Sequence, residues 1–195
     1  MDRLRLFTAV RPPQEVLAAI EETADRLRGR TGKNPVRWVR PENLHVTLQF
    51  LGNTSPELTD ALTATMREAA AESPEAIELS LDRVGAFPNA RKPRTLWVGV
   101  TDADRRLAAL ERALRRRILR LEFDLDQRPF RPHITVGYVR KRVSSEERQA
   151  ITHALQQTDV QTKVFLINEV VLVQSETGPG GSRYTDLATV SLTAP

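Results

Sequence analysis

Two stretches of the chain, residues 41–52 and 129–138, alternate apolar and polar positions with the two-residue period of a half-buried β-strand. The apolar series are Leu44, Val46, Leu48 and Phe50 in the first stretch, and Phe130, Ile134, Val136 and Tyr138 in the second. The polar series are Asn43, His45, Thr47 and Gln49 in the first, and Arg131, His133 and Thr135 in the second. Residues two apart in a strand share a face, so each strand is predicted to bury its apolar series and present a histidine beside a threonine.

Helical periodicity predicts four helices between these and other strands. The first begins at Pro12-Pro13 and ends at Gly29 and Gly32, and the second begins at Ser55-Pro56-Glu57 with serine as the cap. The third is capped by Asp102 or Asp104, and its arginine-rich outer side reads as a solvated face. Ser144 and Glu147 form a capping box for the fourth, on which His153 lies off the buried side.

The remaining segments predict strands and two loops. Strand patterns cover residues 4–10, 36–39, 77–81, 96–100, 164–173 and 184–192, and loops are predicted at 85–93 and 178–181. The order helix, strand, strand occurs on both sides of the midpoint. We therefore expect an α+β fold of two similar lobes, each a small antiparallel sheet covered by helices, within a single domain of residues 1–195.

Composition narrows the class of protein. The 195 residues are 40% hydrophobic and 28% charged, as in a globular domain, and contain no cysteine, which excludes disulfides and thiolate metal sites. The charged N-terminus and the absence of a long apolar run predict a cytoplasmic protein without a membrane partner. Of 29 basic and 25 acidic residues, most of the basic ones are arginine, which favours an anionic ligand.

The chemistry predicted for the paired stretches depends on their histidines. His45 and His133 are two of only three histidines in the chain. Two imidazoles facing one cleft can act as general acid and general base, and a threonine beside each can donate to a phosphate oxygen. The alternative is two ordinary strands with a polar solvent face. No third ligand accompanies either histidine, and no Gly-x-Ser-x-Gly elbow is present, so we expect neither a metal nor a cofactor.

The two His-x-Thr tetrads resemble the signature of the two-histidine phosphoesterases. Their surroundings resemble more narrowly the LigT-like RNA 2′,3′-cyclic phosphodiesterases, also called 2′-5′ RNA ligases. The resemblance extends over residues 3–10, 43–52, 85–88, 93–99 and 130–133, and over the closing pattern Ser175, Gly180, Tyr184 and Leu187. It implies a bilobal fold with the active cleft between the lobes, and metal-free hydrolysis of an RNA 2′,3′-cyclic phosphate.

The resemblance also implies roles for individual residues. His45 would donate a proton to the departing 3′ oxygen, His133 would accept one from water, and Thr47 and Thr135 would hold phosphate oxygens. Further candidates for substrate contact are Arg131, Phe50, Tyr138 and Tyr184. The chain departs from the family at Tyr138, where an arginine is usual, and we expect Arg131 or Arg140 as substitutes. The residue pattern by itself leaves open which histidine is the acid.

Other functions use the same cleft. The enzyme alternatives are phosphodiesterases acting on 2′,5′-linked oligonucleotides or on small nucleoside or ADP-ribose cyclic phosphates, with 2′-5′ ligation as the reverse reaction. A non-catalytic RNA-binding module is the alternative of a different class, and the intact tetrads disfavour it. The expected partners are RNA with a cyclic phosphate end and nucleotides, and we expect a monomer.

Overall fold

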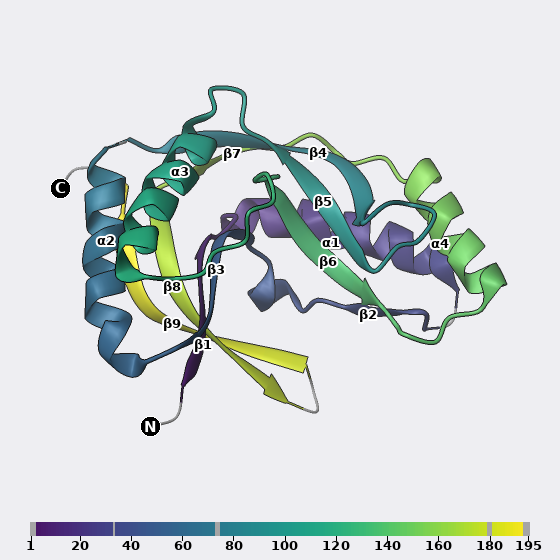
Figure 1. The fold of residues 1–195 in the computed structure, drawn as a ribbon. Coiled ribbons are helices and arrows are strands. Elements are labelled where there is room, and N and C mark those ends of the chain that lie inside the picture. Colours follow the sequence, from purple (N-terminus) through teal and green to yellow (C-terminus); the bar gives the residue numbers. More distant parts are fainter. Residues whose placement is uncertain (1–2, 33, 73–74, 179–180, 193–195) are drawn as a thin grey trace.

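The computed structural model describes residues 3–32, 34–72, 75–178 and 181–192 (Figure 1). The strands are β1 (Leu4–Val10), β2 (Val36–Trp38), β3 (Val46–Thr54), β4 (Ile77–Phe87), β5 (Thr95–Thr101), β6 (His133–Val139), β7 (Val164–Ile167), β8 (Glu169–Gly178) and β9 (Gly181–Ser191). The helices are α1 (Gln14–Thr31), α2 (Thr59–Ala71), α3 (Arg106–Ile118) and α4 (Ser145–Gln157). Every strand pairing within these ranges is antiparallel, which confirms the predicted α+β class.

The strands of the described ranges form one curled nine-stranded sheet rather than two separate small ones. Its order is β7-β4-β5-β6-β3-β1-β8-β9, and β2 pairs with the end of β6 beyond the β3 contact. Helices α2 and α3 cover the half made by β1, β3, β8 and β9, and α1 and α4 cover the other half (Figure 1). The two predicted lobes are therefore present, and they are joined where β3 pairs with β6.

Each half is assembled from distant parts of the chain. The first strand lies in the α2–α3 half, α1 and β2 lie in the other, and β3 returns to the first (Figure 1). Because apolar residues from both halves belong to one continuous buried cluster, the halves share a core. No helix in the described part of the chain is long and apolar enough to cross a membrane.

The local structure confirms several predicted helix signals. The capping box is present, with the Ser144 hydroxyl accepting from the Glu147 N–H and the Glu147 carboxylate accepting from the Ser144 N–H. The Asp102 carboxylate accepts from the N–H groups of Leu107 and Ala108 at the start of α3. Gly32 ends α1 with a φ of 75°, a left-handed value that glycine adopts without steric cost.

Four local predictions are wrong. Ser55 makes no side-chain cap, because a short 3-10 turn at Pro56–Leu58 precedes α2. Gly29 lies inside α1 instead of at its end. Strand β4 continues through Phe87, so the loop predicted from residue 85 begins at Pro88. The arginine side of α3 is not merely solvated, since Arg117 forms ion pairs with Glu68 and Glu72 next to α2. The loop predicted at 178–181 lies partly outside the described residues.

Candidate active site

A single pairing between the two strands brings the His-x-Thr tetrads together. Val46 at the start of β3 is the antiparallel partner of Ile134 near the start of β6. Both side chains are buried, so the residues on either side of each face the opposite, concave side of the sheet. Continuing this register places His45 opposite Thr135 and Thr47 opposite His133. One buried contact between apolar residues thus positions all four predicted polar residues on one face.

His45 is held from both ring nitrogens. Its Nδ1 lies 2.7 Å from the carbonyl oxygen of Asn43, which can only accept, so Nδ1 carries the proton in this contact. Its Nε2 lies 3.0 Å from the Thr47 hydroxyl, which donates to it when the imidazole is neutral. The Phe7 ring stacks on the imidazole with centroids 4.8 Å apart, and the Tyr184 ring meets its edge at 5.4 Å.

Among the described residues, His133 on the opposite strand is hydrogen-bonded through Nδ1 alone. Its Nδ1 donates to the carbonyl oxygen of Arg131 at 2.6 Å, so its Nε2 also faces the cleft. Phe87 meets its ring at 4.8 Å in an edge-on arrangement, and Trp97 lies behind at 6.4 Å. The Trp97 ring lies over Gly85, where an added Cβ would come within 2.2 Å of the indole. Each imidazole therefore has a carbonyl acceptor two residues earlier and two aromatic rings against it.

Burial makes both imidazoles weak bases. The pKa of His45 is lowered to about 4, chiefly by burial, and the positive charge of Arg11 and the neighbouring His133 lower it further. The bond to Asn43 and the charge of Asp186 act in the opposite direction. Burial also lowers the pKa of His133, against the effect of its bond to Arg131. In the free protein, both rings are thus biased toward the neutral form at pH 7.

β-Bulges in both tetrad strands make the predicted faces wrong for the residues that follow them. Consecutive residues of β1 pair with Thr47 and then with Gln49 of β3. Consecutive residues of β5 likewise pair with Thr135 and Gly137 of β6. Each step leaves one residue unpaired and shifts the alternation by one. Phe50, predicted to be buried, therefore lies on the cleft side with 59% of its surface exposed. Tyr138 likewise turns to the cleft side and is 37% exposed.

The bulge in β3 also buries Gln49, which was predicted to lie on the polar face of the strand. Gln49 is 4% exposed, and its amide donates to the Glu111 carboxylate of α3. Burial raises the pKa of this carboxyl group, although the neighbouring Arg115 opposes the rise. The sequence does carry a signal of the bulge, because Leu51 follows Phe50 and so breaks the alternation. A regular strand cannot bury Phe50 and Leu51 on the same face, because adjacent residues point to opposite faces.

The other predicted residues are distributed around the cleft. Tyr184 contacts His45, while the backbone of Arg131, not its side chain, makes the contact to His133. The Arg140 guanidinium donates to the carbonyl oxygen of Asn34 at 2.8 Å. That bond holds Arg140 at the far end of β6 from His133, so Arg140 does not replace the arginine expected at position 138.

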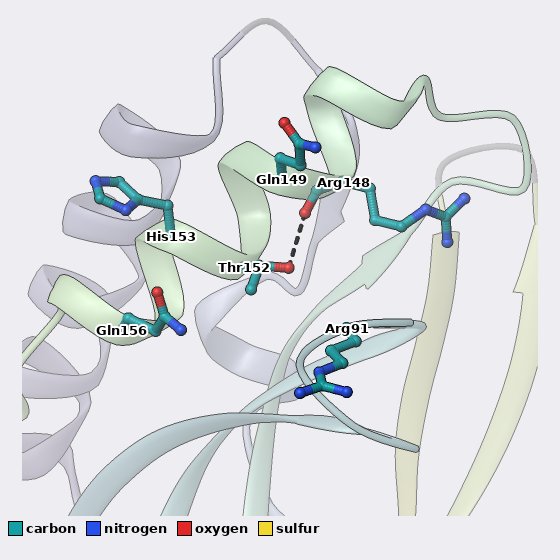
Figure 2. Close-up of a pocket in the computed structure, with 6 residues that line it drawn as sticks. All are labelled: Arg91, Arg148, Gln149, Thr152, His153 and Gln156. Carbon is teal, nitrogen blue, oxygen red and sulfur yellow. Dashed lines mark hydrogen bonds between the residues drawn. The ribbon is translucent and has the colours of Figure 1, made fainter.

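His153 lies outside the cleft, as predicted. It is exposed on α4 and borders a surface cavity of about 460 Å³ between α4 and the loop after β4. Figure 2 shows its ring pointing away from Arg91 and Arg148, which line the same cavity. Thr152 donates to the carbonyl oxygens of Ala90 at 2.7 Å and Arg148 at 3.0 Å, which fixes the loop to the helix. Within the described ranges, no three His, Cys, Asp or Glu side chains are grouped closely enough to hold a metal ion.

Comparison with known proteins assigns the chain and its fold to a family. The model of the 2′-5′ RNA ligase superfamily matches residues 12–179. The chain belongs to this superfamily. The RNA 2′,3′-cyclic phosphodiesterase of Thermus thermophilus is 33% identical over 198 residues, covering 97% of this chain and 90% of the relative. That of Archaeoglobus fulgidus is 30% identical over 186 residues, covering 94% and 98%.

Solved structures agree. Escherichia coli LigT complexed with 3′-AMP superposes with a TM-score of 0.76 at 27% identity, over 98% of this chain and 99% of LigT. The crystal structure of a Thermus thermophilus protein superposes with a TM-score of 0.78 at 27% identity, over 96% and 97%. The resemblance predicted from the sequence is therefore confirmed at the level of family and fold.

In this superfamily member, sequence periodicity does not predict several of the residues that contact or surround the histidines. Phe7, Phe87 and Trp97 support the imidazoles. Arg11 pairs with Asp186 at 2.5 Å, and both act on the pKa of His45. These residues come from β1, β4, β5, β9 and the segment after β1, and only the sheet order brings them to one place.

Proposed function

We propose that this chain hydrolyses the 2′,3′-cyclic phosphate at the end of an RNA strand to a 2′-phosphomonoester, without a metal ion. The observation that carries the proposal is the Val46–Ile134 pairing, which places His45, Thr47, His133 and Thr135 on one concave face. The names of the relatives, which are RNA 2′,3′-cyclic phosphodiesterases, support the substrate class. Intact tetrads of this kind favour an enzyme over a non-catalytic RNA-binding module.

The proposed reaction moves two protons in opposite directions. The Nε2 of His133 takes a proton from water as the water oxygen forms its bond to phosphorus. The bond from phosphorus to the 3′ oxygen breaks, and the Nε2 of His45 gives that oxygen a proton. Thr47 and Thr135 donate to the non-bridging oxygens, whose charge grows as water attacks. Exchange with solvent then returns the proton from His133 to His45.

The lowered pKa values constrain the two roles. A neutral His133 is suited to take a proton from water at pH 7, in line with its assignment as the base. His45, with a pKa of about 4, is neutral in the free protein and must gain a proton before it can act as the acid. A phosphate anion bound between the imidazoles raises the pKa of both, because it stabilises the charged form. In this proposal, binding of the substrate raises the pKa of His45, which then gains the proton that it donates.

Product analysis tests the proposal. An oligonucleotide ending in a 2′,3′-cyclic phosphate is incubated with the protein and EDTA, and the 2′- and 3′-monoesters are separated by chromatography. We expect the 2′-phosphate in the presence of EDTA. Predominant 3′-phosphate would reverse the assigned orientation of the ribose, and activity that disappears with EDTA and returns with zinc would contradict the metal-free reaction.

The same assay separates the alternative substrates. Nucleoside 2′,3′-cyclic phosphates, an ADP-ribose cyclic phosphate and 2′,5′-linked oligonucleotides are tested in parallel at equal concentration. Faster turnover of any of these than of the cyclic-phosphate oligonucleotide would favour that substrate instead. A monomeric state and a cytoplasmic location stay predictions from the sequence.

A further inference from the structure

A groove between the two halves of the molecule lies beside Asn43 and Tyr184, both of which contact His45. A cavity of about 50 Å³ lies beside the β8–β9 hairpin, where the hairpin approaches β2 (Figure 1). We call it the Arg37 groove, and its lining residues are Arg37, Trp38, Val39, Arg40, Asn43, Tyr138, Gly181, Ser182 and Tyr184. Asn43 is the residue whose carbonyl holds His45, so the groove begins next to the proposed acid.

Two aromatic rings line the groove on the way out from His45. Tyr184 contacts the edge of the His45 ring, and Tyr138 lies farther along, 37% exposed, where the bulge in β6 turns it to the cleft side. Nucleic-acid bases stack on exposed aromatic rings regardless of their identity, since every base presents a flat face. The two rings can thus support bases of a single strand that leaves the catalytic histidines.

Positive charge accompanies the rings. The Arg37 guanidinium lies over one face of the Tyr138 ring, 4.8 Å from its centre, which leaves the other face for a base. Among the described residues, Arg37 has no carboxylate partner, whereas Arg40 is paired with Glu42 at 3.3 Å. An exposed arginine without a counter-ion beside an exposed ring matches the backbone phosphate and base of one nucleotide.

The groove is formed by contacts between the halves. Arg40 and Asn43 both donate to the carbonyl oxygen of Ser182, at 3.1 and 2.9 Å, and so fix the hairpin against the segment before β3. The Asn43 amide uses one of its N–H groups in this contact. The cavity has room for a few water-sized groups, which suits a phosphate.

We propose that the Arg37 groove is a subsite for the nucleotide that precedes the cyclic-phosphate nucleotide in a single RNA strand. Arg37 contacts the phosphodiester between these two nucleotides, and Tyr138 stacks on the preceding base. The groove discriminates by chain length instead of sequence: an oligonucleotide fills it and a lone nucleoside cyclic phosphate does not. This inference rests on the proposed function for its substrate and identifies how the strand is held.

The test compares two substrates in each variant. Values of kcat/KM are measured for a nucleoside 2′,3′-cyclic phosphate and for a pentanucleotide ending in the same group. In Arg37→Ala and Tyr138→Ala, the value for the pentanucleotide should fall about tenfold more than the value for the mononucleotide, because only the pentanucleotide loses a phosphate or stacking contact. The difference should reside in KM. For Arg37→Ala, the slope of log KM against log salt should also decrease by about 0.7, as expected for one lost contact to a single-strand phosphate.

Arg67→Ala is the matched control, because Arg67 is an exposed arginine on the outer helix α2. It should leave both values and the salt slope as in the unmodified protein. Equal losses on both substrates, or no loss on either, in Arg37→Ala would overturn the subsite.

A separate measurement keeps the subsite testable if the proposed function fails. If the unmodified protein hydrolyses neither substrate, the reaction is wrong, and fluorescence anisotropy with a labelled single-stranded pentanucleotide decides the subsite. Weaker binding by Arg37→Ala than by Arg67→Ala would support the subsite, and equal binding would overturn it.

Discussion

At the scale of single residues, the two histidines are alike in tautomer and differ in electrostatic surroundings. Both donate from Nδ1 to a carbonyl oxygen two residues earlier, which fixes the ring and directs Nε2 into the cleft. His45 additionally has Arg11 and Asp186 nearby, whose opposite charges act on its pKa. The backbone carbonyl contact is thus common to both histidines, while the Thr47 bond to Nε2 and the charges around His45 distinguish the two.

Replacing either histidine should remove most of the activity. His45→Ala and His133→Ala should each lower kcat by about 10²–10⁴, the usual contribution of a positioned proton donor or acceptor. Because the two groups act in one step, the double variant should be little worse than either single variant. Steady-state kinetics on the cyclic-phosphate oligonucleotide measure this, with His153→Ala as the inert control. Full activity of either single variant contradicts the pairing.

The pH dependence of kcat/KM follows from the lowered pKa values. The reactive protein has one imidazole protonated and one neutral, and the population of this state depends on pH in the same way whichever ring carries the proton. With the pKa of His45 at about 4 and that of His133 below 6.5, this population is largest in that acidic range.

We therefore expect kcat/KM to be highest between about pH 4 and 6.5, and to fall about tenfold per pH unit above the upper pKa. The kcat profile should lie at higher pH, since the bound phosphate raises both pKa values. Rates measured from pH 4 to 9 test this. A kcat/KM that rises steadily beyond pH 7 is incompatible with a histidine acid.

At the scale of elements, the bulges and close strand contacts decide which side chains reach the cleft. Strands β3 and β6 each carry a bulge just after the threonine. Each bulge turns to the cleft side the aromatic residue that lies five positions after the histidine. Strand β4 approaches β5 closely at Gly85, and this approach gives the Trp97 ring its place behind His133. A change at such a contact should affect catalysis without touching a catalytic residue.

Gly85→Ala tests this support of His133. The new Cβ would lie 2.2 Å from the Trp97 ring, so the ring must move and can no longer hold Phe87 and His133 in place. We expect kcat to fall and the free energy of unfolding to decrease by about 1–3 kcal/mol, the usual cost of overpacking. Activity and urea unfolding are measured on the same preparations.

Gly29→Ala is the control for that variant. Gly29 lies inside α1 with no atom within 4 Å of an added Cβ, and alanine is the better helix former. It should unfold at equal or higher urea concentration and keep its activity. If Gly85→Ala also keeps full activity, the Trp97 ring is not needed to position His133.

At the scale of the whole molecule, the two halves are not two consecutive segments of the chain. The sheet order places β1, β3, β8 and β9 on one side of the junction and β2, β4, β5, β6 and β7 on the other. One half takes α1 and β2 from before β3, and the other takes β8 and β9 from after β7, so the chain crosses between the halves several times. The halves should therefore fold and unfold together.

Urea unfolding followed by two probes tests this cooperativity. The two tryptophans are Trp38 in β2 and Trp97 in β5. Both strands belong to the same half of the molecule, so tryptophan fluorescence reports on that half alone. Far-UV circular dichroism reports on the helices and strands of both halves. We expect the two transitions to coincide, as in two-state unfolding. A fluorescence transition at a clearly different urea concentration would show that one half unfolds independently.

The sequence by itself determined the tetrads, the element types and the family resemblance, because these depend on local periodicity and on residues close together in the chain. Alternation predicted the strand around His45, and helical spacing with the Ser144 capping box predicted α4. Only the tertiary structure decided which residues meet across the sheet. Phe7, Trp97 and Asp186 reach the histidines through strand pairings between distant segments, which no local pattern contains. The faces of Phe50 and Tyr138 were predicted wrongly, because a bulge arises from the mismatch between two paired strands and shifts the alternation that each strand shows alone.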